Sequence, residues 1–115
     1  AHRRVEHWTN ARDMPTVAAR TLLADLHGAP TVDPYADPPY FWTQQFGVRV
    51  QMAGRVDPAL NFDVVDGAVD GDFVAVQSRR GSVSAVIGWN SPRSFVRVRR
   101  SHDREFRSTE RLEIV

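Results

Sequence analysis

The stretch from Pro38 to Phe46 reads Pro-Pro-Tyr-Phe-Trp-Thr-Gln-Gln-Phe and places four aromatic residues within nine positions. Aromatic residues make up only 10% of the whole chain. The two prolines fix their own φ angles and favour extended geometry in the residue before each, so they form a stiff lead-in loop that orients the rings. Two interpretations remain open. The rings either cap a small core or form a wall against a planar ligand.

Downstream of this stretch the apolar residues alternate, which is typical of β-strands. Val48, Val50 and Met52 share one face of a predicted half-buried strand that ends at Gly54. Further strands are predicted at 62–65, 73–77 and 83–89. Alternate residues of the last strand share a face that we expect to form the core, namely Val83, Ala85, Ile87 and Trp89.

Turn residues separate these predicted strands. The three predicted turns are Asp66-Gly67, Asp70-Gly71 and the hairpin turn Ser78-Arg79-Arg80-Gly81. The sequence therefore indicates an α+β fold, in which an antiparallel sheet of about four to five strands has helices packed on one face.

Upstream of the aromatic stretch, a helix is predicted from about Arg12 to His27. Pro15 would clash beyond the first turn of an earlier helix, so we expect a regular helix only from about Met14. Gly28, followed by Ala29 and Pro30, is a typical helix stop. An apolar stripe predicts that one face of this helix is buried, and it consists of Val17, Ala18, Leu22, Leu23 and Leu26.

Two segments complete the predicted organisation. Residues 29–39 hold four prolines and no periodicity, which indicates a linker. Ser91 and Pro92 provide an N-cap and a first-turn proline for a helix whose apolar residues are Phe95, Val96 and Val98. Residues 104–115 contain few apolar side chains and are predicted to be a tail that ends in an edge strand.

Composition limits the possible functions. The 115 residues support one domain, with 42% hydrophobic residues, 25% charged residues and a net charge of +1. The absence of cysteine excludes disulfides, thiolate catalysis and cysteine-ligated iron–sulfur or zinc sites. The histidines are too scattered for a metal motif, and we expect all four to be surface or loop residues, namely His2, His7, His27 and His102.

Other motifs are also missing. The seven glycines form neither a dinucleotide fingerprint nor a P-loop, so any cofactor phosphate would be bound elsewhere. The sequence holds no apolar run long enough for a membrane span and no basic-then-apolar leader. We therefore expect no membrane contact and a cytoplasmic location.

An arginine cluster raises an alternative function. Arg79 and Arg80 lie in a predicted hairpin, and further arginines follow at positions 97, 99, 100 and 104. A basic helix near an exposed hairpin is also found in small α+β modules that bind nucleic acids. Because a net charge of +1 gives a weak attraction to phosphates, we rank this alternative second and expect no nucleic-acid partner.

Three segments resemble the flavin-dependent ferredoxin and rubredoxin reductases. Residues 39–54 resemble the start of the C-terminal domain of those enzymes, where a Phe-Trp-Ser-Asp-Gln-Tyr type of segment leads into the first strand. Residues 4–12, Arg-Val-Glu-His-Trp-Thr-Asn-Ala-Arg, resemble the exit from their FAD-binding domain. Residues 88–93, Gly-Trp-Asn-Ser-Pro-Arg, resemble their last strand-to-helix turn. The spacing of the three segments makes the match more specific than any single motif.

The resemblance implies a domain division and a role. Residues 1–28 would be the exit segment and helix of the FAD-binding domain, residues 29–39 a linker, and residues 40–115 the C-terminal domain. The parent enzyme would pass electrons from NAD(P)H through FAD to a ferredoxin or rubredoxin. Glu6, Trp8 and the backbone around Asn10 would lie beside the flavin, and Trp42 would approach it from the C-terminal domain. Trp8 would also lie near the docked partner.

The resemblance also has limits. The family has Asp where this chain has Gln44, and Ser where it has Thr43, so a role that needs a carboxylate beside the flavin does not carry over. We expect the chain alone to be non-catalytic and to bind no cofactor tightly. Its partners would be the FAD and NAD(P)H domains of the same parent chain, and its bare apolar helix predicts that the isolated chain redocks this helix or forms a homo-oligomer.

Overall fold

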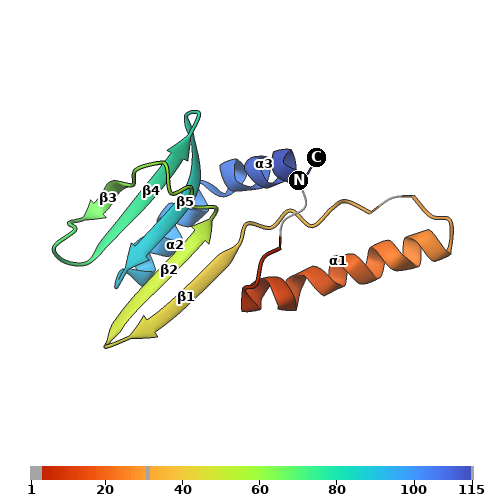
Figure 1. The fold of residues 1–115 in the computed structure, drawn as a ribbon, viewed down its shortest axis with the longest axis horizontal. Helices are drawn as coiled ribbons and strands as arrows, with labels where there is room; N and C mark the ends of the chain where they lie inside the picture. Colours follow the sequence, from red (N-terminus) through yellow and green to blue (C-terminus); the bar gives the residue numbers. More distant parts are fainter. Residues whose placement is uncertain (1–3, 31, 115) are drawn as a thin grey trace.

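The computed structural model describes residues 4–30 and 32–114, and their side chains up to Ser108. One antiparallel sheet contains five strands in the order β1-β2-β5-β4-β3. Helices α2 and α3 lie against one face of this sheet, whereas α1 projects away from it (Figure 1). The predicted α+β fold is therefore confirmed. The element bounds are α1 Trp8–Leu26, β1 Tyr40–Gln45, β2 Val48–Gly54, β3 Asp63–Gly67, β4 Phe73–Arg79, β5 Ser82–Trp89, α2 Pro92–Ser101 and α3 Asp103–Ile114.

The core lies between the sheet and the two C-terminal helices. Phe95 of α2 and Phe106 of α3 are each 1% exposed, and both pack on a buried cluster that contains Ala53, Val74 and Val86. A Cβ atom on Gly88 would lie 3.0 Å from the Phe95 side chain, so glycine lets this ring lie directly on β5. We call the opposite face, without α2 and α3, the open face.

The predicted core face of β5 is correct in part: Val83 and Ala85 are buried, but Ile87 is only half-buried and Trp89 is exposed. Val86 pairs with Ala53 on one side and Val76 on the other, and these three residues lie under the helices. Ile87 and Trp89 therefore lie on the open face. Val83 still reaches the core, because a register shift after Gln77 reverses the alternation.

Strand β2 has the two faces that were predicted. Gln51, Ala53 and Gly54 are the buried residues of this strand, whereas Val48, Val50 and Met52 are half-buried and share the open face. Alternation marks two faces but not which one the helices cover. Because both faces of these strands carry apolar residues, the sequence pattern did not separate them.

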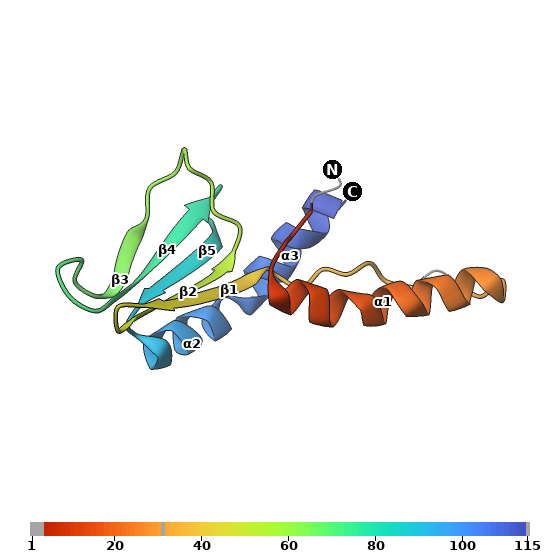
Figure 2. The same ribbon diagram turned by 60° about the horizontal axis from the view of Figure 1, so that its bottom comes forward.

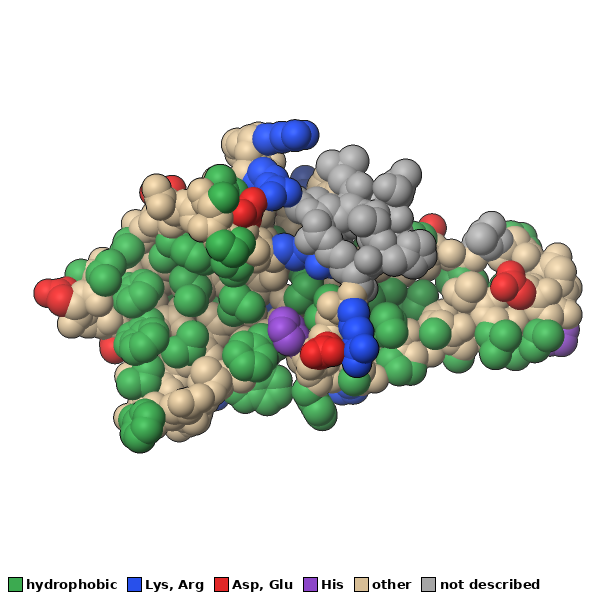
Figure 3. Space-filling view, in the orientation of Figure 1, with side chains coloured by type: hydrophobic (Ala, Val, Ile, Leu, Met, Phe, Trp, Pro, Cys, Tyr) green, Lys and Arg blue, Asp and Glu red, His purple; other side chains and the backbone are tan. Residues whose placement is uncertain are grey.

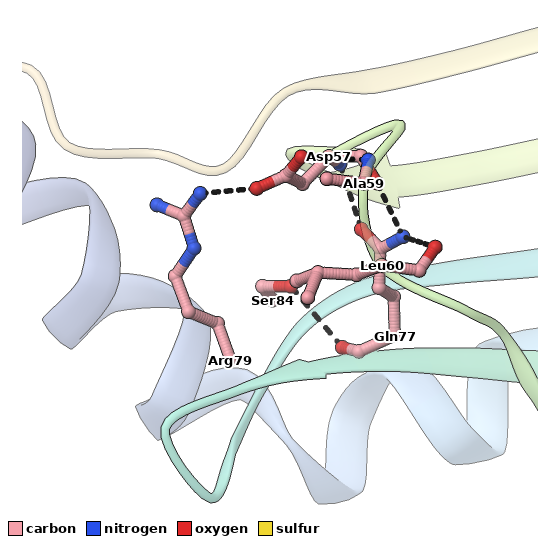
Figure 4. A network of polar contacts seen from close by, with 6 residues as sticks. All are labelled: Asp57, Ala59, Leu60, Gln77, Arg79 and Ser84. Carbon is pink, nitrogen blue, oxygen red and sulfur yellow. Dashed lines mark hydrogen bonds and ion pairs between the residues drawn. The ribbon is translucent and has the colours of Figure 1, made fainter.

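A polar network joins the β2–β3 loop to the open face at one end of the sheet (Figure 4). Gln77 is fully buried, and its side chain accepts from the Asp57 N–H at 2.7 Å and donates to the carbonyls of Asp57 and Leu60 at 2.8 and 2.9 Å. Arg79 also forms an ion pair with Asp57. The loop therefore covers this end of the open face, and Figure 2 shows it on the side opposite α2.

The turns agree with the prediction in part. Asp70 and Gly71 lie in a turn closed by a hydrogen bond from the Gly71 N–H to the Ala68 carbonyl, as predicted. The β4–β5 turn is narrower than predicted, because Arg79 still pairs with Ser82. Asp66 and Gly67 do not form the predicted turn but end β3, where a bulge keeps them paired with β4.

Helix α1 begins earlier than predicted. It starts at Trp8, and Pro15 lies inside it. A proline at this depth costs about 3 kcal/mol or more in an isolated helix. The first turn is nevertheless held by the sheet, because Thr9 Oγ1 donates to the Tyr40 carbonyl at 2.6 Å. Tertiary contacts therefore override the local signal.

The end of α1 follows the prediction, but its apolar stripe does not. Gly28 has φ of +63°, and the Ala29 N–H reaches the Ala24 carbonyl at 2.9 Å, as in a Schellman motif. Beyond its first turn, however, α1 extends away from the sheet (Figure 1). Leu22, Leu23 and Leu26 are 60%, 55% and 70% exposed, so the predicted burial of this face does not occur within the described chain.

The C-terminal elements correct one further prediction. Helix α2 begins at Pro92 as predicted, although the Ser91 side chain makes no capping hydrogen bond. The predicted tail is instead helix α3, and Val115 lies outside the described residues. Among the described side chains of α3, which end at Ser108, Phe106 is the buried one that packs on the sheet. It can do so because Gly54 leaves room, since a Cβ atom there would lie 2.9 Å from the Phe106 ring.

Candidate functional site

The aromatic stretch forms strand β1 rather than the expected loop. Residues 40–45 pair with β2 along their whole length, and β1 is an edge strand of the sheet. Tyr40 points toward the helices and packs against the core, with its ring centroid 6.1 Å from that of Phe95. Phe41 and Trp42 stay 41% and 39% exposed. The strand therefore presents aromatic rings at an open edge instead of burying them all.

The start of α1 lies beside this edge. The Trp8 ring contacts the Trp42 ring edge-on, with centroids 5.9 Å apart and planes at 89°. The Tyr40 ring stacks on the other side of Trp42 at 5.8 Å. Trp8 remains 62% exposed. A residue of the exit segment and a residue of the sheet thus share one aromatic cluster, 34 positions apart in the chain.

A hollow of about 550 Å³ opens on this cluster. Four of its lining residues are Trp, Tyr or Phe, and four polar side chains line it as well, which is a common composition for a ligand site. The lining residues are Glu6, His7, Trp8, Tyr40, Phe41, Trp42, Thr43 and Gln44.

Three of the four predicted site residues meet in this hollow. Glu6, Trp8 and Trp42 all line it. Asn10 does not, because its side chain turns back to donate to the Val5 carbonyl at 3.1 Å. Asn10 instead lines a smaller polar hollow of about 200 Å³ between α1, the linker and α3.

His7 and Phe41 belong to the site but were not predicted. The His7 ring lies 5.2 Å from the Phe41 ring, and His7 was expected to be an ordinary surface or loop residue. Its Nδ1 atom is buried and has no hydrogen-bond partner among the described residues. Sequence spacing links neither residue to the other, since the contact depends on how residues 4–7 cross β1.

Charged groups lie at the rim of the hollow. The guanidinium of Arg12 lies 5.0 Å from the centroid of the Trp8 ring. A hydrogen bond to Asp13, 2.5 Å from Arg12 Nε, raises the pKa of Arg12 and lowers that of Asp13. Glu6 forms an ion pair with Arg4 at 2.9 Å, but both side chains are largely exposed, so the pair contributes little to stability.

Tyr40 connects the hollow to the core. Gln51 Nε2 donates to the Tyr40 hydroxyl at 3.0 Å, and the Arg99 guanidinium lies 5.1 Å from the centroid of the Tyr40 ring. With the hydrogen bond from Thr9 to its carbonyl, Tyr40 is held by α1, β2 and α2 together. The ring that stacks on Trp42 is therefore firmly placed.

Part of the arginine cluster is paired. Arg97 binds Asp66, and a further arginine outside the cluster, Arg107, binds both Asp37 and Asp103. Together with the Arg79 ion pair, these contacts neutralise part of the basic surface. The absence of a nucleic-acid partner stays a prediction.

Neither a metal site nor a membrane span is found in the described ranges. Residues 4–30 and 32–114 contain no group of three or more His, Asp or Glu residues suited to hold a metal ion. Among the same residues, no helix is both long and apolar enough to cross a bilayer.

Comparisons with known proteins agree on one family. The model of the family described as "Reductase C-terminal" matches residues 40–112. The ferredoxin reductase component of chlorobenzene dioxygenase from Cupriavidus sp. (strain PS12) is 30% identical over 93 residues, which cover 81% of this chain and 21% of the relative. A ferredoxin–NAD(P)(+) reductase from Sphingomonas sp. is 30% identical over 97 residues, which cover 84% of this chain and 22% of the relative.

Solved structures are also similar. The crystal structure of Fdr9 matches with a TM-score of 0.69 and 28% identity, over 82% of this chain and 24% of that one. The crystal structure of the covalent putidaredoxin reductase–putidaredoxin complex matches with a TM-score of 0.65 and 25% identity. The match covers 90% of this chain and 23% of that one. The chain thus spans only about a fifth of the length of the curated relatives it matches. Because the family model covers more than half of the chain, this chain belongs to the reductase C-terminal domain family of the ferredoxin reductases.

Proposed function

We propose that this chain is the C-terminal part of a flavin-dependent ferredoxin reductase, in which the aromatic hollow covers the flavin and Trp8 lies near the docked electron acceptor. The observation that carries the proposal is the meeting of Trp8 and Trp42 at one exposed hollow. Relatives and a structural neighbour that are named as ferredoxin reductases, or as a reductase in complex with its redoxin, support it.

The residues of the hollow fit a flavin ring. Trp8, Phe41 and Trp42 offer apolar faces to a planar ring system, and Thr43 and Gln44 offer hydrogen-bond donors and acceptors to its polar edge. The buried and unpartnered Nδ1 of His7 is a further polar atom that a ligand could satisfy. When bound, FAD would supply the step from hydride transfer to single-electron transfer.

The residues of this chain would orient the ring and exclude water from it. Trp42 is placed by the Tyr40 ring, which itself packs on the core, so the wall has a rigid support. Trp8 is the most exposed of these rings and sits where an acceptor protein could reach it. Aromatic residues in such positions often carry much of the energy of a protein interface.

The proposal includes the domain division and the partners predicted from the sequence. Residues 1–28 would be the exit segment and helix of the FAD-binding domain, and residues 40–115 would form the C-terminal domain. Residues 29–39 would be the linker between them. FAD and NAD(P)H would be bound chiefly by the preceding domains of the parent chain, and the acceptor would be a ferredoxin or rubredoxin. The projection of α1 away from the sheet fits a helix that belongs to another domain.

A comparison of two electron acceptors tests the role of Trp8. In the full-length reductase, Trp8→Ala should slow the reduction of ferredoxin by about tenfold. The substitution removes an aromatic side chain that contributes about 1.4 kcal/mol to the binding of ferredoxin. Reduction of a small acceptor such as ferricyanide should be almost unchanged, since it needs no docking surface.

Trp89→Ala is the matched control, because it removes another exposed tryptophan that does not line the hollow. It should change both rates by the same factor. If Trp8→Ala also lowers both rates equally, Trp8 serves flavin binding or folding and its assignment to the docking site is wrong.

A further inference from the structure

The open face carries an apolar row that crosses all five strands. In an antiparallel sheet, directly paired residues point to the same face. The register pairs Phe41 with Met52, Met52 with Ile87, Ile87 with Ala75 and Ala75 with Val64. Four spacings of about 4.8 Å make this row roughly 19 Å wide.

A second row lies beside the first. Val50 pairs with Trp89, and Trp89 pairs with Phe73. The Trp89 and Phe73 rings are stacked, with planes at 4° and centroids 6.2 Å apart. Neither row contains a charged residue. We call the two rows together the open-face patch.

Much of the open-face patch is accessible in the described chain, although Ala75 within the first row is only 1% exposed. Phe41, Val64 and Trp89 are each 41% exposed. On the other face of the sheet, beneath α2 and α3, several side chains are fully buried. Figure 3 looks onto this face and shows hydrophobic side chains gathered over the strands. Monomeric proteins rarely leave large apolar patches uncovered.

The N-terminal segment reaches the edge of the open-face patch. His7 packs on Phe41, which ends the first row. Val5 and His7 also line a hollow together with Met52 and Val56. Residues 4–7 therefore lie at the open face and not at the face that α2 and α3 cover.

We infer that the open-face patch is the contact surface for the polypeptide that precedes this segment in the same chain. This inference rests on the proposed function, which makes the segment part of a longer reductase. The curated relatives are about five times as long as their matched regions, so a large covering body is present in proteins of this kind. An uncharged patch is typical of a permanent interface, whereas a transient acceptor protein is usually steered by charge.

Covalent linkage strengthens this assignment. The preceding polypeptide is tethered at the edge of the patch, so its contact is intramolecular and needs little intrinsic affinity. A second copy of the segment or a lipid surface has no such advantage. The covering body would thus lie across the sheet, opposite α2 and α3.

Thiol labelling provides a direct test, because the segment has no cysteine. Val64→Cys places one thiol at the far end of the first row, away from the aromatic hollow. Ser101→Cys is the matched control, because it is exposed on α2 at the covered side. Each variant is labelled with N-ethylmaleimide in the 115-residue chain and in the full-length reductase, and mass spectrometry follows the peptide that carries the new thiol.

We expect labelling of Val64→Cys to be about tenfold or more slower in the full-length reductase, since reaction then needs local opening. Ser101→Cys should react equally fast in both proteins. Equal rates for Val64→Cys would overturn the inference. So would protection that appears in the 115-residue chain as its concentration rises, which indicates a second copy, or protection that needs lipid vesicles. The labelling result does not depend on Trp8 or the flavin, so failure here is distinct from failure of the acceptor test.

Discussion

The two faces of the sheet differ in what covers them. On one face, Phe95 and Phe106 seal a buried cluster, and each ring is 1% exposed. On the other face, Trp89 and Phe41 stay 41% exposed although the strands are equally apolar there. Strands with apolar residues on both faces are typical of sheets that are covered on both sides. The described chain therefore covers one face of the sheet with its own helices and leaves the other face for the contact proposed above.

Substitution of an aromatic residue on each face gives the largest predicted difference. Phe95→Ala should lower the free energy of unfolding by about 3 to 5 kcal/mol, because it opens a cavity over Gly88. Trp89→Ala should cost only about 1 kcal/mol in the 115-residue chain, because the ring is half-exposed and loses mainly its stack on Phe73. Denaturation in urea measures both values. Similar costs would mean that the open face is already a sealed core.

A smaller effect concerns the polar anchor of the covered face. Glu105 of α3 accepts hydrogen bonds from the His102 side chain and from the Val83 N–H of β5, and these bonds lower the pKa of its carboxyl group. A carboxylate with a lowered pKa stabilises the fold fully above its ordinary pKa of about 4.5, and this contribution is lost as the pH falls through the lowered value.

The wild-type chain should therefore lose stability as the pH falls below about 4.5. Glu105→Gln should cost about 1 kcal/mol at pH 6, a value reduced for partial exposure, and almost nothing near pH 2, so its acid transition is shallower. His102→Ala removes the largest cause of the lowered pKa of Glu105, so this pKa rises toward its ordinary value. The acid-induced loss of stability should therefore begin at a higher pH in this variant. Denaturation curves recorded across this range are the measurement. Parallel curves for Glu105→Gln and wild type would show that Glu105 does not anchor α3.

Local signals in the sequence were enough to predict much of the fold. The stop of α1 at Gly28, the start of α2 at Pro92 and the strands β2, β4 and β5 depend on short-range chemistry and were predicted. The start of α1 at Trp8 was not predicted, because it depends on contacts of Trp8 and Thr9 with β1. These contacts join residues that are 31 or more positions apart in the sequence. Helix α3 was missed because only one aromatic residue among its described side chains, Phe106, attaches it to the core.

The choice of the covered face could not be predicted either. Val86 and Ile87 are both apolar, and Val86 is the buried one because it packs in the cluster with Phe95 and Phe106. Family resemblance led to Glu6, Trp8 and Trp42, which do share one hollow. His7 and Phe41 escaped prediction, because their contact depends on the path of the segment at residues 4–7.

In the proposed enzyme, the aromatic edge of β1 covers the flavin. The most direct test is the visible absorption and fluorescence of the flavin in full-length reductase that carries Trp42→Phe. This change keeps an aromatic ring and should cost little stability, since Trp42 is 39% exposed. If Trp42 walls the flavin, the absorption bands should shift or the quenching of flavin fluorescence should change, and Trp89→Phe should leave both unchanged. A flavin spectrum identical to that of the wild type would contradict the account and would make Trp42 a structural residue only.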